Sequence, residues 1–316
     1  MEPKQKSGPS AASLLPGVIA VGLVVGFFYF IEKGLGPGQA YTPTGWWKST
    51  WNEVTDFEHG FLVPLITIGL IIWKWPRLKE ARETAVEKSM WLGLLVALAG
   101  AGFFVLAHRT GQPRLACGGL PMILWGCTWY FWGWKVAKLT AFPFFVLWLA
   151  IPVPQFQQAT THLQILSTKL AQIGCGWFGV ETEVRGTQIF SLNDNWEPLE
   201  INEGCGGIRS LMALILISTV WAYVAKMSLW KKALLCVSAI PLAIIGNMLR
   251  LTSIFVIAEY GDPVFARDTW HDWSGLIVFY PISLLLLLTL HSFLEGGLTR
   301  FRKPQLTRRE VVKSTG

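Results

Sequence analysis

Long apolar runs separated by short polar stretches dominate this chain, and the runs lack the charged faces that a soluble helix would carry. A helix needs about 20 apolar residues to cross a hydrocarbon core of ~30 Å, and fewer where neighbouring helices or a thin bilayer help. The pattern therefore predicts an all-α, polytopic integral membrane protein. Eight runs qualify as transmembrane helices, at roughly 13–31, 60–75, 91–107, 117–134, 139–153, 208–225, 233–258 and 275–294.

The chain has 316 residues and no internal repeat, which predicts a single membrane-embedded domain. We place this domain at residues 13–298, between a cytoplasmic tail at 1–12 and a basic cytoplasmic tail at 299–316. The first apolar run is interpreted as a retained helix, because it is longer than the ~7–15 apolar residues of a signal peptide. The longest interruption between runs, 154–207, is expected to form an extracytoplasmic segment.

Two elements are predicted in this segment, before the sixth apolar run. The stretch THLQILSTKLAQIG has the spacing of an amphipathic helix, whose apolar side is formed by Leu163, Leu166, Leu170 and Ile173. Such a helix typically lies along the membrane surface. The alternation and turn residues of VETEVRGTQIFSLNDNWEPLEI then predict a small hairpin, with Asn193 and Asp194 near its tip.

Basic residues set the predicted orientation, because Lys and Arg collect in cytoplasmic loops. A cytoplasmic N-terminus places most of the 27 Lys and Arg in inner segments and puts the C-terminus inside as well. We therefore expect a multi-pass protein of the cytoplasmic (inner) membrane, surrounded by membrane lipids, with both termini cytoplasmic. Basic inner loops are enough to produce the net charge of +7, so no nucleic-acid partner is expected.

Candidate chemistry begins in LEINEGCGGIRSLMALILI, residues 199–217, where a cysteine lies between an acidic stretch and an apolar run. Cys205 is followed by Gly206 and Gly207, and Arg209 shares its helical face at i+4. A cysteine at the edge of a membrane helix is most often a small packing residue. The alternative is a nucleophile with a cation beside it.

The predicted topology brings other polar groups to the depth of Cys205. The seventh apolar run travels outward, so Arg250 lies near the outer leaflet, with Asn247 three residues earlier on the same face. His271 comes just before the eighth run and His59 just before the second, and the two histidines compete for an acid–base role. Thiol, guanidinium and imidazole groups are thus expected at one level, facing the extracytoplasmic side.

These groups suit nucleophilic catalysis by a cysteine. A helix N-terminus, a cation or a histidine lowers the pKa of a thiol from about 8.5 toward the working pH. The backbone N–H groups of Gly206 and Gly207 could approach a developing oxyanion closely. Arg250 would stabilise the thiolate or the tetrahedral intermediate, while His271 would protonate the leaving amine and later activate the acceptor.

The two arginines also have structural explanations, which the sequence leaves open. An arginine is expensive in an apolar helix, which favours a functional role for Arg250, but a pairing with Asp262 or Glu259 would also account for it. Arg209 could orient the backbone of a substrate, or it could pair with Glu203 and fix the loop.

No metal or cofactor is predicted, because the sequence contains no CxxC pair, no His-x-x-x-His spacing and no glycine-rich phosphate loop after a strand. A disulfide between Cys175 and Cys205 is an open alternative that would inactivate the proposed nucleophile. Three further cysteines are interpreted as packing residues of the apolar runs, namely Cys117, Cys127 and Cys236.

The order of these motifs resembles the exosortase/archaeosortase family of membrane transpeptidases. The family pattern begins with HG at the start of an early helix, which is His59-Gly60 here, and continues with a Cys-Ser-Gly-x-x-Ser type motif, which is residues 205–210. It then has a helix with N-x-x-R, which is Asn247 to Arg250, and a later histidine, which is the His271 of WHDWSG. The resemblance extends from about residue 57 to 294. This chain departs from it at Gly206, where the family commonly has serine.

The resemblance implies a catalytic cysteine, arginine and histidine at Cys205, Arg250 and His271. It implies as substrates exported proteins with a C-terminal sorting signal of the PEP-CTERM type, which are cleaved through a cysteine thioester. The product would then pass to an amine or hydroxyl acceptor, carried on a lipid or polysaccharide. Two other classes remain as alternatives: a simple intramembrane cysteine protease, and a transporter of a lipid-linked or polar solute lined by Asn247 and Arg250.

Overall fold

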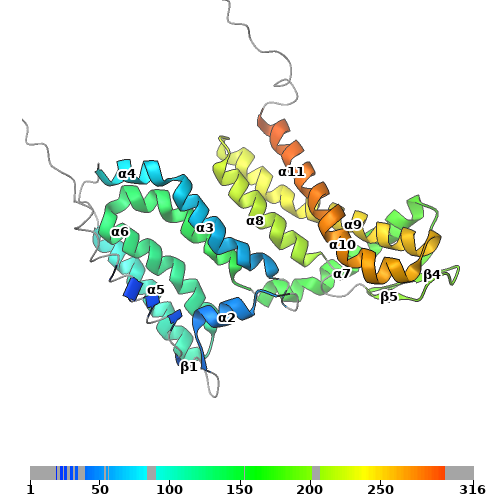
Figure 1. Ribbon diagram of the computed structural model, residues 1–316, viewed down its shortest axis with the longest axis horizontal. Coiled ribbons are helices and arrows are strands. Elements are labelled where there is room, and N and C mark those ends of the chain that lie inside the picture. The colour runs from blue at the N-terminus through cyan, green and yellow to red at the C-terminus, as the bar shows by residue number, and fades with distance from the viewer. Residues whose placement is uncertain are drawn as a thin grey trace, which may run out of the picture.

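The computed structural model describes residues 40–52, 55, 57–83, 90–152, 154–200 and 207–295, together with short pieces between 19 and 34. Both predicted tails, most of the first apolar run and the predicted nucleophile Cys205 lie outside the described residues. The described chain is mostly helical (Figure 1), as the apolar runs predict.

Helices make up most of the structure, and two small sheets accompany them. The helices before the hairpin are α2 (Pro43–Ser49), the 3-10 turn η2 (Glu58–Phe61), α3 (Leu62–Trp73), α4 (Trp75–Glu83), α5 (Met90–Thr110), α6 (Pro113–Val146), the 3-10 turn η3 (Leu147–Ala150) and α7 (Pro154–Trp177). Those after it are α8 (Ile208–Val224), α9 (Leu229–Tyr260), the π-helical turn η5 (Phe265–Trp270), α10 (His271–Ser274), the π-helical turn η6 (Gly275–Phe279) and α11 (Tyr280–Glu295). The strands are β1 (Lys33–Gly34), β2 (Ala40–Tyr41), β3 (Thr182–Arg185), β4 (Gln188–Ser191) and β5 (Leu199–Glu200).

Among the described residues, fewer helices qualify as membrane spans by length and composition than the eight apolar runs predict. Within the described residues, Met90–Thr110, Leu229–Tyr260 and Ile277–Glu295 are long and apolar enough to cross a membrane. A fourth candidate is the pair Glu58–Trp73 and Trp75–Glu83, which is bent by 55°. A multi-pass membrane protein is therefore supported, whereas the count of eight is not confirmed.

The runs 117–134 and 139–153 correspond to the two halves of α6 and the turn η3 that follows. A break at Gly133 (φ 80°, ψ 173°) separates the halves, and glycine is the residue that adopts such a conformation readily. The first half packs against α5 through glycines: a Cβ at Gly100 or Gly126 would lie less than 3.0 Å from the opposite backbone. Small residues thus allow this close helix contact, as in other membrane helix pairs.

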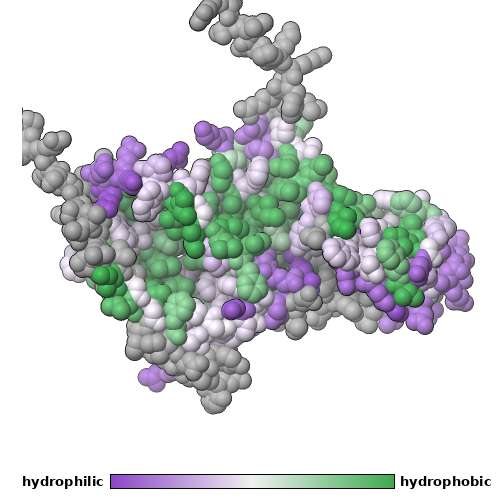
Figure 2. All heavy atoms as spheres, in the orientation of Figure 1, coloured by the Kyte–Doolittle hydropathy of each residue, from purple (hydrophilic) through white to green (hydrophobic). Residues whose placement is uncertain are grey.

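Large apolar side chains point outward on the membrane-crossing helices. Trp91 and Leu95 of α5 and Leu285 of α11 are more than half exposed. Figure 2 shows hydrophobic side chains over α3, α8 and α11, with hydrophilic ones over α4 and around the β3–β4 hairpin. Such an exterior is what a bilayer requires and what water would disfavour.

Helix α9 is the centre of the C-terminal half (Figure 1). Its first part packs with α8 and α11 through apolar residues that include Leu214, Leu235 and Leu287. Its second part packs with α7 and the hairpin through residues such as Ala171 and Phe255. Helix α7 and the hairpin strands therefore meet on the C-terminal half of α9.

The amphipathic helix predicted before the hairpin is present as α7, and its apolar side is only partly covered: Leu163 packs on the cluster around Phe57, whereas other apolar residues are more exposed. Leu166 and Ile173 are 40% and 53% exposed. The buried side carries small and polar residues, which are Gln164, Ser167, Thr168, Ala171 and Cys175. Because the small side allows α7 to approach α9 closely, the larger apolar side remains available to lipid.

The predicted hairpin region forms a three-stranded antiparallel sheet in the order β3-β4-β5, which contains two hairpins. Strands β3 and β4 pair with Arg185 opposite Gln188, which leaves Gly186 and the following residue as a two-residue turn. Gly186 has φ +66°, the conformation that tight hairpin turns need. Asn193 and Asp194 lie in the loop of the second hairpin, between β4 and β5, so the structure adds a turn that the sequence analysis did not predict.

Glu259, near the end of α9, binds the segment that connects β4 and β5. Its two carboxylate oxygens accept hydrogen bonds from Ser191 Oγ (3.2 Å), Asn193 Nδ2 (3.1 Å), Asn195 Nδ2 (2.6 Å) and Trp196 Nε1 (2.8 Å). Four donors on one carboxylate satisfy its acceptor sites almost completely. One side chain of α9 thus holds this segment by polar contacts, in addition to the apolar packing of the sheet on the helix.

Removal of this carboxylate should loosen the hairpin. In Glu259→Ala, the Trp196 indole N–H, on a side chain only 7% exposed, loses its acceptor, which is expected to cost about 2 kcal/mol of unfolding free energy. Thermal unfolding in detergent and protease cleavage within 182–200 measure the loss. Glu197→Ala is the matched control, because the Glu197 side chain is 89% exposed. Equal effects of the two substitutions would contradict this role of Glu259.

Candidate functional site

Asn247 and Arg250 lie three residues apart on the buried face of α9, as their spacing predicts. They are 1% and 9% exposed. The amide Nδ2 of Asn247 donates a hydrogen bond to Ser167 Oγ of α7 (3.1 Å). A buried polar contact between two otherwise apolar helices specifies their relative position, so Asn247 sets where α7 lies against α9.

The start of α8 lies against the same asparagine. Gly207 is the N-cap residue of α8 with φ +90°, and a Cβ at this position would lie 3.0 Å from Asn247 Nδ2. Both the backbone conformation and the limited space therefore favour glycine. Cys205 and Gly206 are outside the described residues, and Cys205 comes two residues before Gly207 in the sequence.

Arg250 is held by the turn that precedes α11. Its Nε donates to Ser274 Oγ (3.1 Å) and its Nη2 donates to the backbone oxygen of His271 (2.9 Å). Ser274 Oγ in turn donates to the same backbone oxygen (3.1 Å). The side chain of Arg250 is thus bound to α10 at two points, which brings the predicted arginine and histidine together.

The carboxylates considered as structural partners of Arg250 have other partners. Glu259 accepts hydrogen bonds from the hairpin segment, and Asp262 Oδ1 accepts them from the backbone N–H groups of Val264 (2.8 Å) and Phe265 (3.3 Å). Glu259 and Asp262 thus each stabilise a connecting segment next to α9.

His271 is partly exposed at the beginning of α10. The exposed fraction of its side chain is 34%, and its Nδ1 lies 3.3 Å from Asp272 Oδ1. Burial lowers the pKa of His271 below its usual value near 6.5, and the guanidinium of Arg250 is the next largest cause. Arg209 lowers this pKa further by a smaller amount, whereas Asp272 raises it. The imidazole is therefore neutral at pH 7 and able to accept a proton.

Arg209, in the first turn of α8, forms an ion pair that the sequence did not predict. Its Nε lies 3.3 Å from Glu58 Oε2 of η2, and both side chains are partly exposed. Glu203, the partner considered from the sequence, lies outside the described residues. The hydroxyl of Tyr280 is within electrostatic range of Glu58, Arg209 and Arg250, so these charges surround one region.

His59 makes different contacts from those of His271. It is 6% exposed, its Nε2 lies 3.2 Å from the backbone oxygen of Leu149, and its ring packs on Phe57 with centroids 5.1 Å apart. Among the described residues it has no hydrogen bond to Arg250 or His271. His59 therefore joins η2 to η3, and His271 is the better placed acid–base candidate.

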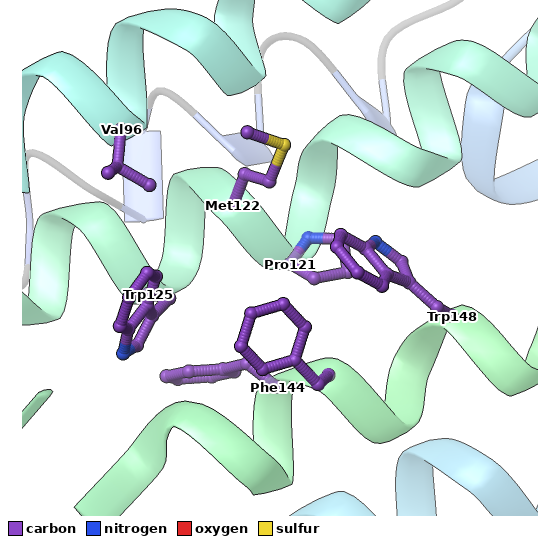
Figure 3. Close-up of a pocket in the computed structure, with 7 residues that line it drawn as sticks. Val96, Pro121, Met122, Trp125, Phe144 and Trp148 are labelled. Atoms are coloured by element: carbon purple, nitrogen blue, oxygen red, sulfur yellow. The ribbon is translucent and has the colours of Figure 1, made fainter. Parts of the chain in front are cut away.

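An apolar pocket lies outside this polar region. It is lined by side chains of α5, α6 and η3 (Figure 3), namely Val96, Pro121, Met122, Trp125, Phe144, Phe145 and Trp148. The two indole N–H groups in this set donate to the backbone oxygens of Ala137 and Gly118. Because its lining offers no reactive group, we do not assign catalysis to this pocket.

Three residues of the site were missed in the sequence: Ser167, Ser274 and Glu58. Ser274 follows His271 by three residues in HDWS, which would have placed both on one helical face. Ser167 and Glu58 carry no comparable signal, because their partners Asn247 and Arg209 are 80 and about 150 residues away. Cys175, the possible disulfide partner of Cys205, is a buried free thiol.

Comparison with known proteins identifies a family for this chain. A family model described as transmembrane exosortase matches residues 50–288, which is well over half of the chain. The matched range contains Cys205, Asn247, Arg250 and His271. The chain matches no curated protein and no solved structure.

Substitution of Gly207 tests how tightly α8 begins against Asn247. In Gly207→Ala, the positive φ and the contact with the amide both oppose the new Cβ, and we expect a loss of about 1–3 kcal/mol in thermal unfolding. Gly186→Ala is the matched control, because Gly186 also has a positive φ (+66°) but nothing within 4 Å.

In an Asn247→Ala background, Gly207→Ala should cost less than in the wild type, since the amide that opposes the new Cβ is gone while the strained φ remains. The Asn247→Ala chain is the reference for this comparison, because it also lacks the hydrogen bond to Ser167. A loss in Gly207→Ala no larger than that in Gly186→Ala, and equal in both backgrounds, would contradict the contact.

Proposed function

Because this chain belongs to the transmembrane exosortase family, we propose that it is a cysteine transpeptidase for the C-terminal sorting signals of exported proteins. The proposed substrates carry a signal of the PEP-CTERM type, which is cut at the extracytoplasmic face of the cytoplasmic membrane. The cleaved protein then passes to an amine or hydroxyl acceptor. Lipid-linked and polysaccharide-linked groups are the proposed acceptors.

One observation carries this proposal: Arg250, His271 and the start of α8 occur together at one end of the helices. Asn247 holds Gly207, two residues after Cys205 in the sequence, and Arg250 on the same face of α9 binds the backbone of His271. A nucleophilic cysteine needs a cation and a base nearby, and this part of α9 supports both. Cys205 enters the proposal from its sequence position and the family motif.

In the first half of the proposed reaction, His271 takes the proton of the Cys205 thiol. The thiolate sulfur then attacks the carbonyl carbon of the scissile peptide bond and forms a C–S bond. Arg250 stabilises the oxyanion, aided by the backbone N–H groups of Gly206 and Gly207. When the C–N bond breaks, the imidazolium of His271 gives its proton to the leaving amine, and a thioester remains on Cys205.

In the second half, the neutral imidazole of His271 accepts a proton from the attacking amine or hydroxyl. The acceptor forms a bond to the thioester carbon, the C–S bond breaks, and the Cys205 sulfur recovers a proton. Attack by water instead would make the protein a simple protease. Mass spectrometry of a processed substrate distinguishes the two, since hydrolysis leaves a free carboxylate at the new C-terminus and transfer leaves an attached group.

Substitution of the nucleophile separates the enzyme from a transporter. Cys205→Ala should lower processing of a sorting-signal substrate by a factor of about 10³ or more, and Cys205→Ser nearly as much, because a hydroxyl lacks the low pKa that the reaction needs. Immunoblotting of the substrate and of the membrane-inserted chain measures processing and insertion in the same cells. Normal processing by Cys205→Ala would exclude this reaction, whereas Cys117→Ala, at a buried packing thiol, is expected to remain active.

The pH dependence tests the role of His271. The pKa of His271 lies below 6.5, so its imidazole is neutral and can act as a base at neutral pH. The value of kcat/KM should therefore fall only when the pH drops below the lowered pKa of His271. Asp272 raises this pKa, and Asp272→Asn should therefore move the acid limb of the pH profile further down. A limb that stays in place or moves up in Asp272→Asn would assign the titration to another group.

A further inference from the structure

Ser274 has a contact pattern that the reaction scheme above does not use. It is the last residue of α10, and its exposed fraction is 0%. Its hydroxyl accepts a hydrogen bond from Arg250 Nε (3.1 Å) and donates one to the backbone oxygen of His271 (3.1 Å). That oxygen also accepts a hydrogen bond from Arg250 Nη2 (2.9 Å), so the three groups form a closed triangle.

This triangle fixes the plane of the guanidinium. Nε and Nη2 lie on the same edge of an arginine side chain, and two acceptors along one edge define its orientation. Loss of the Ser274 hydroxyl would remove one of the two hydrogen bonds that hold this edge. The buried hydroxyl of Ser274 accepts from Arg250 Nε and donates to the His271 oxygen, so both its donor and an acceptor site are used.

We propose that Ser274 is a positioning residue, which orients the Arg250 guanidinium relative to His271 for the reaction at Cys205. This inference rests on the proposed function for its kinetic consequence, but its geometric part concerns only Arg250 and His271. Without the hydroxyl, the guanidinium moves away from the position in which it faces the oxyanion. A misplacement of about 1 Å in a catalytic group lowers rates by up to about 10²-fold.

A serine that only stabilised the turn through its bond to the His271 oxygen would leave the charge of Arg250 in its place, and this difference supplies the test. Arg250 is one of the charges that lower the pKa of His271, so a guanidinium that has moved away lowers it less. In Ser274→Ala, the imidazole should therefore titrate closer to 6.5 than in the wild type. Burial continues to act in both chains, which limits the shift to the part due to Arg250.

The experiment uses the full chain in lipid nanodiscs, with its five histidines labelled for NMR. The signal of His271 is assigned by its loss in His271→Gln and followed through a pH titration. We expect an upward shift of its pKa in Ser274→Ala and a fall of about ten- to a hundred-fold in kcat, with KM little changed. Ser274→Thr, which keeps the hydroxyl, should restore both, and Ser274→Cys replaces Ser274→Ala if the alanine variant does not accumulate.

Ser283→Ala is the matched control. Ser283 of α11 is 1% exposed, and its Oγ has no hydrogen-bond partner among the described residues. The same chemical change there should alter neither the titration nor kcat. Similar effects of Ser283→Ala and Ser274→Ala would overturn the proposal, as would a Ser274→Ala chain that titrates like the wild type or keeps its kcat.

The two proposals fail in different ways. Normal processing by Cys205→Ala would refute the proposed function, and the titration would still report whether Ser274 orients Arg250. Conversely, an unchanged titration in Ser274→Ala, together with a loss of processing in Cys205→Ala, would refute only the role of Ser274.

Discussion

The burial of one guanidinium, that of Arg250, determines much of the structure around the site. A charged side chain in an apolar helix is costly unless its N–H groups find acceptors. Here the acceptors are the hydroxyl of Ser274 and the backbone oxygen of His271. The segment after α9 must therefore fold back so that α10 lies against Arg250. The π-helical turns η5 and η6 lie directly before and after α10, and such turns frequently mark functional sites. The arginine thus defines the position of the histidine.

Asn247, one turn before Arg250 on the same face of α9, contacts two further helices. Asn247 bonds Ser167 of α7 and lies against Gly207 at the start of α8, while Arg250 holds α10. Three elements, α7, α8 and α10, therefore meet within one turn of α9. Because the two contacts are polar and specific in direction, they set these elements more precisely than apolar packing alone would. The N-x-x-R spacing is in this sense a structural device as well as a chemical one.

The mostly helical, multi-pass architecture could be predicted from the apolar runs, and helical spacing placed Asn247 and Arg250 on one face of α9. The details depend on long-range contacts that leave no local pattern. Glu58 and Arg209 are about 150 residues apart, so their ion pair has no signature in either helix. Gly186 and the Asn193–Asp194 pair are both good turn residues, and only the strand register shows that each lies in a turn of its own. The break at Gly133 divides α6 into two helices, which correspond to the two apolar runs of the sequence.

Two polar contacts join the N-terminal helices to α8, one toward each end of that helix. At the site, Glu58 of η2 pairs with Arg209 in the first turn of α8. Near the other end, Lys74 donates to the backbone oxygen of Leu139 (3.0 Å) and to the hydroxyl of Tyr223 in the last turn. Between them, α8 contributes mainly apolar side chains, which permit sliding because their contacts are not directional. The two ends therefore set the axial position of α8, and with it the position of Gly207 beside Asn247.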